Sequence, residues 1–319
     1  MAKEWTEKED KLLGKLVRSL GFAWLDISQR LGRTPDSVRM RWRNTRGETK
    51  TSGKMRDPEY IASNMPRVGL FDTETLPLEG FAWRAWDVSF SPDQIISGTS
   101  LLSWAGKFLN ESDMYSDILT SKEALVKDDE RIAKSCWEFL AQCDVVVGHN
   151  LIDFDTKVAN TAFIKHGLPP IKYIQVDTLK IARKFFKFDM NKMGVLNRQL
   201  GLSEKMENEG FPLWRACREG DQDALDKMIA YNKQDVLALE DLFYKLRPYA
   251  PHQFNVALFN ETEKQLCPVC GSDKLEVIGD YYTPAGKWDS LRCQNCTAVS
   301  RGKENKLSKD KKKALLVNS

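Results

Sequence analysis

The feature that most constrains the fold of this chain is a set of acidic residues that follow short apolar runs. The first run, at 67–72 (RVGLFD), predicts a buried strand because it combines aliphatic, β-branched and aromatic residues. Asp72 lies at the end of this run, and Glu74 follows two positions later. Side chains two apart in an extended chain point to the same side, so both carboxylates are expected on one side of the strand.

Further along the chain, the remaining members of the set lie on predicted helices. A second buried strand is expected at 144–149 (DVVVGH), followed by a helix over 153–167 with Asp155 in its first turn. A long helix is expected over 221–246, where apolar residues recur at helical spacing. It carries Tyr231 and Asp235, which are four residues apart and therefore share one face.

Carboxylates in this number predict a site for hard metal ions. Carboxylate oxygens suit Mg²⁺ or Mn²⁺, and four of them brought together would repel one another without a cation. Two such ions about 3.5–4 Å apart stabilise both the attacking and the leaving oxygen of an in-line displacement at phosphorus. A phenol beside them can orient or help to deprotonate the attacking water. The expected site residues are Asp72, Glu74, Asp155, Asp235 and Tyr231.

The three segments resemble the Exo I, II and III motifs of the DEDD 3′→5′ exonucleases. Asp72-Thr73-Glu74 matches the first motif, and Asn150 followed after three residues by Phe154-Asp155 matches the second. Tyr231-x-x-x-Asp235 matches the third in its tyrosine form. The residues in and around these motifs are similar to those of the editing domains of family B DNA polymerases and of predicted RNase H-like exonucleases, including phage-encoded ones.

This resemblance covers roughly 68–248 and implies an RNase H-like α/β fold, in which helices flank a mixed sheet. It implies a metal-dependent 3′→5′ exonuclease acting on DNA, with two Mg²⁺ or Mn²⁺ ions and the single-stranded 3′ end of DNA in the active site. Asn150 and Leu76 are then expected beside the nucleic acid. Leu76 would wedge against the terminal base, although a core leucine is an equal alternative.

Three neighbouring residues leave alternatives open. Asp153 competes with Asp155 for the metal, but the spacing of the second motif favours Asp155. His149 is more consistent with a structural residue at a strand end than with a catalytic base, since the motif already supplies a tyrosine. Asp177 is expected to cap a helix, with a place at the rim of the site as the alternative.

Charge is distributed unevenly along the 319 residues, whose net charge is +3. Both ends of the chain are basic and the middle is mildly acidic, as expected if the ends hold a polyanion. The chain has no apolar stretch long enough for a membrane span and no apolar signal region at its start. Seven cysteines in a chain without such a signal region predict reduced thiols and not disulfides. The expected location is therefore cytoplasmic, in the host cell if a phage encodes the protein.

The N-terminal segment predicts a small three-helix module over 1–50. Helices are expected over 6–21, 23–32 and 34–44, the first with a capping box formed by Thr6 and Glu9. Tryptophans at positions 5, 24 and 42 recur at nearly equal spacing, as suits the core of a small domain. The segment resembles a single Myb/SANT repeat, and a linker is expected over 51–67.

The third predicted helix lies in a basic region, with nine Lys or Arg and two acidic residues between positions 28 and 56. Acidic SANT modules bind protein tails, whereas this basic helix is typical of a duplex DNA reader in the major groove. A solvated basic face without a partner is the alternative. The side chains expected to contact DNA are Arg39, Arg43, Asn44 and Arg46.

The C-terminal segment contains two Cys-x-x-Cys pairs, and four thiolates suit one tetrahedral Zn²⁺. The interval between the pairs is long enough for a hairpin with its turn at 283–286. The segment 262–302 resembles a zinc ribbon with structural zinc, and a redox dithiol is the alternative. The basic tail 303–319 is expected to be flexible. The expected zinc ligands are Cys267, Cys270, Cys293 and Cys296.

These observations predict an exonuclease domain over 68–250 flanked by two modules that hold DNA or a replication or recombination protein. An exoribonuclease or a structure-directed endonuclease with the same site is the first alternative. The alternative of another class is a nucleic-acid-binding recruitment protein with an inactive nuclease core.

Overall fold

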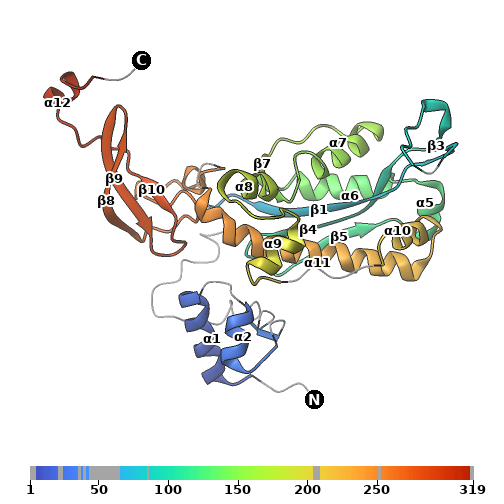
Figure 1. Ribbon diagram of the computed structural model, residues 1–319, viewed down its shortest axis with the longest axis horizontal. Coiled ribbons are helices and arrows are strands. Elements are labelled where there is room, and N and C mark those ends of the chain that lie inside the picture. Colours follow the sequence, from blue (N-terminus) through green and yellow to red (C-terminus); the bar gives the residue numbers. More distant parts are fainter. Residues whose placement is uncertain are drawn as a thin grey trace. The chain divides into compact units, whose positions relative to one another are not determined.

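The chain forms two compact units (Figure 1), and each is described by itself. The first unit joins Met1–Lys50 to Arg67–Phe243, and the second joins Thr51–Pro66 to Tyr244–Ser319. The computed structural model describes residues 5–20, 24–34, 37–38, 41–42, 65–84, 86–203, 209–250 and 253–316. Within these residues, no helix is both long and apolar enough to cross a membrane.

A mixed five-stranded sheet forms the centre of the first unit, in the order β5-β4-β1-β6-β7. The central strand β1 is antiparallel to β4 and parallel to β6, which confirms the predicted mixed sheet. β7 is parallel to β6, and β5 is antiparallel to β4. The strands are β1 (Val68–Leu76), β4 (Ser100–Phe108), β5 (Tyr115–Ile118), β6 (Val145–Gly148) and β7 (Ile174–Asp177).

Strand β1 is longer than the sequence predicted, so Asp72 and Glu74 lie within the strand and not at its end. Hydrogen bonding to β4 continues along the whole of β1, with a bulge between Glu74 and Thr75. Pairing with β6 reaches only as far as Leu70. The acidic half of β1 therefore extends past its pairing with β6, which makes room for a pocket beside the carboxylates.

Both faces of the sheet are covered by helices, and Figure 1 shows α6 and α7 on one face and α11 on the other. Alternate residues of β4 serve the two faces: Trp104 donates its indole N–H to Ser135 of α6, whereas Lys107 forms a buried ion pair with Glu240 of α11. The helices described after β1 in this unit are α5 (Ser121–Val126), α6 (Glu130–Leu140), α7 (Asp155–Lys165), α8 (Thr178–Phe185), α9 (Met193–Gln199), α10 (Phe211–Arg218) and α11 (Gln222–Leu246).

Close packing of α6 on the sheet requires a glycine in β4. A Cβ atom at Gly106 would lie 2.4 Å from the ring of Phe139, closer than carbon atoms can approach. Phe139 packs against Phe71, Trp104 and Phe108 within the main core cluster. The predicted helix after β6 is confirmed as α7, and it ends before Gly167, whose φ is +69°.

Residues between β1 and β4 form a small hairpin that the sequence analysis did not predict. Its strands are β2 (Glu79–Gly80) and β3 (Ile95–Ser97), with the short helix η1 (Pro92–Gln94) before β3. The aromatic side chains of this segment are exposed, Trp83 almost completely. Such short strands carry little helical or strand periodicity, which explains why the sequence did not predict the hairpin.

Two helices of the predicted N-terminal module are described along their whole backbone, α1 (Glu7–Leu20) and α2 (Trp24–Leu31). The capping box is confirmed, because the Glu9 amide donates to Thr6 Oγ1 and the Thr6 amide donates to Glu9 Oε2. Of the third predicted helix, residues 34, 37–38 and 41–42 are described: the last four are helical, and Thr34 Oγ1 accepts from the amide of Ser37. The core of this module contains Leu13, Leu16, Ile27, Leu31 and Val38, with Trp5 and Trp42 packed against it.

A three-stranded antiparallel sheet, in the order β10-β9-β8, dominates the second unit. The predicted hairpin is confirmed, and its turn lies between Thr283 and Gly286. The tail contains structure that its composition did not predict: Ser308 caps the short helix α12 (Lys309–Lys313). The elements before α12 are η2 (Arg247–Tyr249), η3 (Val256–Phe259), β8 (Leu275–Thr283), β9 (Gly286–Cys293) and β10 (Val299–Arg301).

Candidate active site

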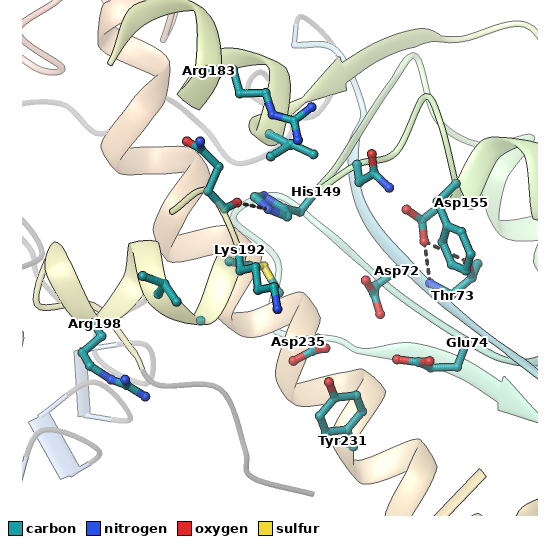
Figure 2. Close-up of a pocket in the computed structure, with 17 residues that line it drawn as sticks. Asp72, Thr73, Glu74, His149, Asp155, Arg183, Lys192, Arg198, Tyr231 and Asp235 are labelled. Carbon is teal, nitrogen blue, oxygen red and sulfur yellow. Dashed lines mark hydrogen bonds between the residues drawn. The ribbon is translucent and has the colours of Figure 1, made fainter. Parts of the chain in front are cut away.

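A pocket of about 870 Å³ opens beside the acidic half of β1. Its walls come from β1, from the loop after β6, and from the helices α7, α8, α9 and α11. All five residues of the predicted site line it, although up to 163 positions separate the first from the last in sequence. The fold therefore gathers the three sequence segments around one cavity (Figure 2).

Three of the carboxylates form a group suited to a cation. Asp72 and Glu74 of β1 and Asp235 of α11 each offer an oxygen, and these oxygens lie within 4.8 Å of one another. Asp235 is buried, and the other two are half-buried. Like charges at this separation repel strongly in a partly buried site, so the arrangement favours a bound divalent cation.

Asp72 is held in place by a pair of polar side chains that the sequence analysis did not single out. Asn232 is fully buried, and its amide nitrogen donates to Asp72 Oδ2 at 2.6 Å. The amide oxygen of Asn232 accepts a bond from Ser103 Oγ of β4 at 3.1 Å. Asn232 follows Tyr231 on α11, so its place within the third motif was the one sequence signal that could have pointed to it.

Asp155 lines the same pocket, outside the group of three. One of its oxygens, Oδ1, accepts hydrogen bonds from both the backbone N–H and the hydroxyl of Thr73, at 2.9 and 2.8 Å (Figure 2). Burial raises the pKa of Asp155 to about 7, although the two bonds from Thr73 act in the opposite direction. The middle residue of the first motif thus orients the acid of the second.

Tyr231 is 4% exposed and lies one helical turn before Asp235. Its ring packs edge-on against Trp214 of α10, with centroids 6.3 Å apart. In Figure 2 the phenol points toward the carboxylates of Asp235 and Glu74. This orientation is the one that a water-orienting phenol requires.

The residues with open alternatives have structural contacts. His149 bridges two segments, since its Nδ1 lies 2.9 Å from Thr178 Oγ1 and its Nε2 lies 2.9 Å from the carbonyl oxygen of Asn191. Asp177 caps α8, as predicted, by accepting from the amides of Leu179 and Lys180.

The second motif is also shaped by Asp177, which accepts from the backbone amides of Asn150 and Ile152 at the end of β6. Asn150, at φ +71°, lines the pocket as well. Asp153 is exposed and pairs with Lys157 and Lys180 outside the pocket lining. These contacts favour Asp155 over Asp153 as the acid of this motif.

The other expected nucleic-acid contacts have different positions. Leu76 is fully buried in the main core cluster, which favours packing over a wedge against a base. The expected DNA contacts of the N-terminal module lie outside the described residues. They are Arg39, Arg43, Asn44 and Arg46.

A second cluster of metal-binding groups lies in the C-terminal unit, where the two Cys-x-x-Cys pairs meet. The Sγ atoms of Cys267 and Cys296 are 3.5 Å apart, and those of Cys270 and Cys293 are 3.6 Å apart. Zinc–sulfur bonds of about 2.3 Å in a tetrahedron place the sulfurs about 3.8 Å apart. The four thiols therefore fit one zinc ion.

Comparisons with known proteins agree with this architecture. Residues 108–247 match the family described as the RNase_H superfamily, and residues 5–57 match the Myb-like DNA-binding domain. The chain therefore carries an RNase H-like domain and a Myb-like DNA-binding domain. The first match begins after β1, so the inclusion of Asp72 and Glu74 in the site depends on the geometry described above.

Similarity to individual proteins is partial. The DNA polymerase III PolC-type of Ureaplasma parvum serovar 3 (strain ATCC 700970) is 23% identical over 154 residues, which are 48% of this chain and 9% of that protein. The structure of the family B DNA polymerase from the hyperthermophilic archaeon Pyrobaculum calidifontis aligns with a TM-score of 0.42 and 14% identity. That alignment covers 70% of this chain and 33% of the polymerase.

Proposed function

We propose that residues 68–250 form a 3′→5′ exonuclease that hydrolyses the phosphodiester bonds of DNA with two Mg²⁺ or Mn²⁺ ions. One observation carries the proposal: oxygens of Asp72, Glu74 and Asp235 lie within 4.8 Å of one another in a pocket that Asp155 and Tyr231 also line. The 3′→5′ direction rests on the resemblance of the three motifs to those of the DEDD exonucleases.

Each side chain has a distinct task in this reaction. Asp72, Glu74 and Asp235, with Asp155 as the fourth carboxylate, would hold the metal ions. When bound, two such ions polarise the scissile phosphate and lower the pKa of the attacking water. Tyr231 orients that water through its hydroxyl, which can both donate and accept a hydrogen bond. Asn232 and Thr73 keep Asp72 and Asp155 in position through the bonds described above.

The flanking modules are proposed to hold the substrate. The Myb-like module over 1–50 would bind duplex DNA and be joined by the linker 51–67 to the catalytic domain. The C-terminal unit would be a ribbon over 262–302 with one structural Zn²⁺, followed by the basic tail 303–319. The choice of DNA as the substrate is supported by the Myb-like match and by the PolC relative, which is named a DNA polymerase.

The direct test is cleavage of end-labelled single-stranded and double-stranded DNA and RNA with Mg²⁺, Mn²⁺ or EDTA. A single DNA strand labelled at its 5′ end should shorten from its 3′ end in single-nucleotide steps, and EDTA should stop the reaction. Preference for RNA would instead indicate an exoribonuclease, and internal cuts would indicate an endonuclease. Binding without cleavage under every metal would indicate a recruitment protein.

Substitution of the carboxylates tests the assignment of the site. Asp72→Ala and Asp235→Ala should each abolish cleavage while leaving DNA binding largely intact, because each removes a metal ligand and leaves the basic N-terminal module unchanged. Asp189→Ala is a matched control, since Asp189 is exposed and does not line the pocket. Undiminished cleavage by either of the first two variants would contradict the proposed site.

A further inference from the structure

Three basic side chains line the active-site pocket, and we call them the basic wall: Arg183, Lys192 and Arg198. Arg183 belongs to α8, Lys192 precedes α9, and Arg198 lies in the last turn of α9. All three are exposed, and none forms an ion pair with another residue in the part of the chain that the structure describes. Figure 2 shows them on one side of the pocket, with Asp72, Glu74 and Asp155 on the other.

The backbone beside Lys192 and Arg198 is hydrogen-bonded to the elements that carry the catalytic residues. Asn197 of α9 is fully buried, and its side-chain amide donates to the carbonyl oxygen of Ala238 in α11 at 3.2 Å. The carbonyl of Asn191, next to Lys192, is held 2.9 Å from His149 Nε2 at the end of β6. The backbone that carries Lys192 and Arg198 is therefore bonded to α11, which carries Asp235, and to the segment that follows β6 and precedes Asp155.

A phosphodiester strand needs such a surface in this pocket. Only its scissile phosphate can lie at the carboxylates, and the next phosphates along the strand must be neutralised elsewhere. Lys192 and Arg198 are six residues apart, which corresponds to about 9 Å along a helix axis, so they suit two different phosphates. Exposed cations without carboxylate partners do not have to break an ion pair before they bind a phosphate oxygen.

We propose that the basic wall binds the non-scissile phosphates of a single nucleic-acid strand whose terminal phosphodiester lies at the carboxylates. This proposal rests on the proposed function, because it identifies the substrate as a strand of several nucleotides and not a mononucleotide ester. The wall then determines how much higher kcat/KM is for a longer strand than for a short substrate. The wall would contact phosphate groups and not base edges, so its contribution should be the same for different base sequences.

The test compares two substrates in the full-length protein with Mn²⁺. One is a single DNA strand of about twenty nucleotides, and the other is the p-nitrophenyl ester of thymidine 5′-monophosphate, which has no further phosphates. The double variant Arg183→Ala/Arg198→Ala should lower the ratio of kcat/KM for the strand to kcat/KM for the ester by about tenfold or more, mainly through KM. The slope of log KM against log salt should also become shallower, by about 0.7 for each phosphate that the variant no longer neutralises.

Matched variants make the result decisive. Lys184→Ala/Lys187→Ala removes two exposed cations near α8 that do not line the pocket, and the ratio should stay at its wild-type value. Arg183→Lys/Arg198→Lys keeps the charges and should retain most of the ratio even if the alanine variant folds poorly. An unchanged ratio in the alanine variant, or an equal fall in the Lys184/Lys187 control, would overturn the proposal.

Failure of the proposed function would give a different result. In that case the wild-type protein would hydrolyse neither substrate with any metal. The basic wall would still be tested by fluorescence anisotropy with the same labelled strand over a salt series. A shallower salt slope in the alanine variant than in the Lys184/Lys187 control would support the wall as a phosphate-binding surface, and equal slopes would overturn it.

Discussion

At the scale of single residues, the most informative contact is the bond from Asn232 to Asp72. We predict that Asn232→Leu lowers the rate or the apparent Mg²⁺ affinity by about 10- to 100-fold, as loss of a residue that orients a metal ligand usually does. The Mg²⁺ concentration that gives half-maximal cleavage is the measurement. Ser103→Ala, which removes only the outer bond to Asn232, should cause a smaller change in the same direction. Wild-type Mg²⁺ dependence in Asn232→Leu would show that Asp72 needs no such support.

Tyr231 offers a second prediction at this scale. Tyr231→Phe removes the phenol but keeps the ring that packs on Trp214, so folding should be preserved. Cleavage should slow by about 10²-fold or more, as expected for loss of a group that assists proton transfer. The Mg²⁺ dependence should stay that of the wild type, since the carboxylates remain. Wild-type rates in this variant across roughly pH 6–9 would remove Tyr231 from the mechanism.

At the scale of elements, Asp129 joins a strand to two helices. It is 2% exposed at the start of α6, and its carboxylate accepts bonds from the Leu101 amide of β4 and from Lys165 and His166 at the end of α7. Burial by itself would raise the pKa of Asp129, but the bonds from Lys165, His166 and Leu101 outweigh it and lower the pKa.

We predict that Asp129→Asn destabilises the protein by about 2 kcal/mol at neutral pH, because it replaces a buried carboxylate that accepts hydrogen bonds from Leu101, Lys165 and His166. A carboxyl group with a lowered folded-state pKa stabilises the fold above its unfolded pKa of about 3.9. This stabilisation is lost as the pH falls through the folded-state pKa. Urea unfolding should therefore show the gap between the two proteins narrowing in acid. Asp189→Asn, at an exposed residue, should show no gap at either pH.

The C-terminal hairpin is the second element with a clear test. β8 and β9 bring the two cysteine pairs together, and few large apolar side chains are buried among the described residues of this small sheet. We predict one zinc per chain by elemental analysis, and none in Cys267→Ser/Cys293→Ser. Chelation should unfold this sheet before the RNase H-like domain, because metal binding supplies much of the folding free energy of such small modules. Loss of near-ultraviolet circular dichroism from Trp288 would report the unfolding.

At the scale of the whole molecule, the basic ends and the acidic middle suggest a division of tasks. Deletion of residues 1–50 should lower the affinity for duplex DNA and flatten its salt dependence, since it removes seven of the nine basic residues between positions 28 and 56. Turnover of a short single strand should stay near the wild-type value, because all the proposed catalytic residues lie beyond the deletion. Equal duplex affinities and slopes in the two proteins would favour a protein-binding role for the Myb-like module.

The sequence by itself determined which side chains lie together when they are only a few residues apart in one strand or helix. Two residues in a strand share a side, and two residues four apart in a helix share a face, so Asp72 with Glu74 and Tyr231 with Asp235 were paired from spacing alone. The same holds for the capping box of α1 and for the helix cap at Asp177. Each of these relations depends on the backbone within a few residues, which periodicity and turn chemistry encode.

Beyond the five site residues that the motif resemblance had already grouped, tertiary structure alone decided which side chains from distant segments meet. Thr73 meets Asp155 across 82 positions, and Asn232 meets Asp72 across 160. Those contacts depend on strand order, on register and on the helix that covers each face, and none of these leaves a local periodic signal. The basic wall was missed for the same reason, because an exposed Lys or Arg resembles any solvated cation in sequence. Its place beside the carboxylates follows from the packing of α9 on α11.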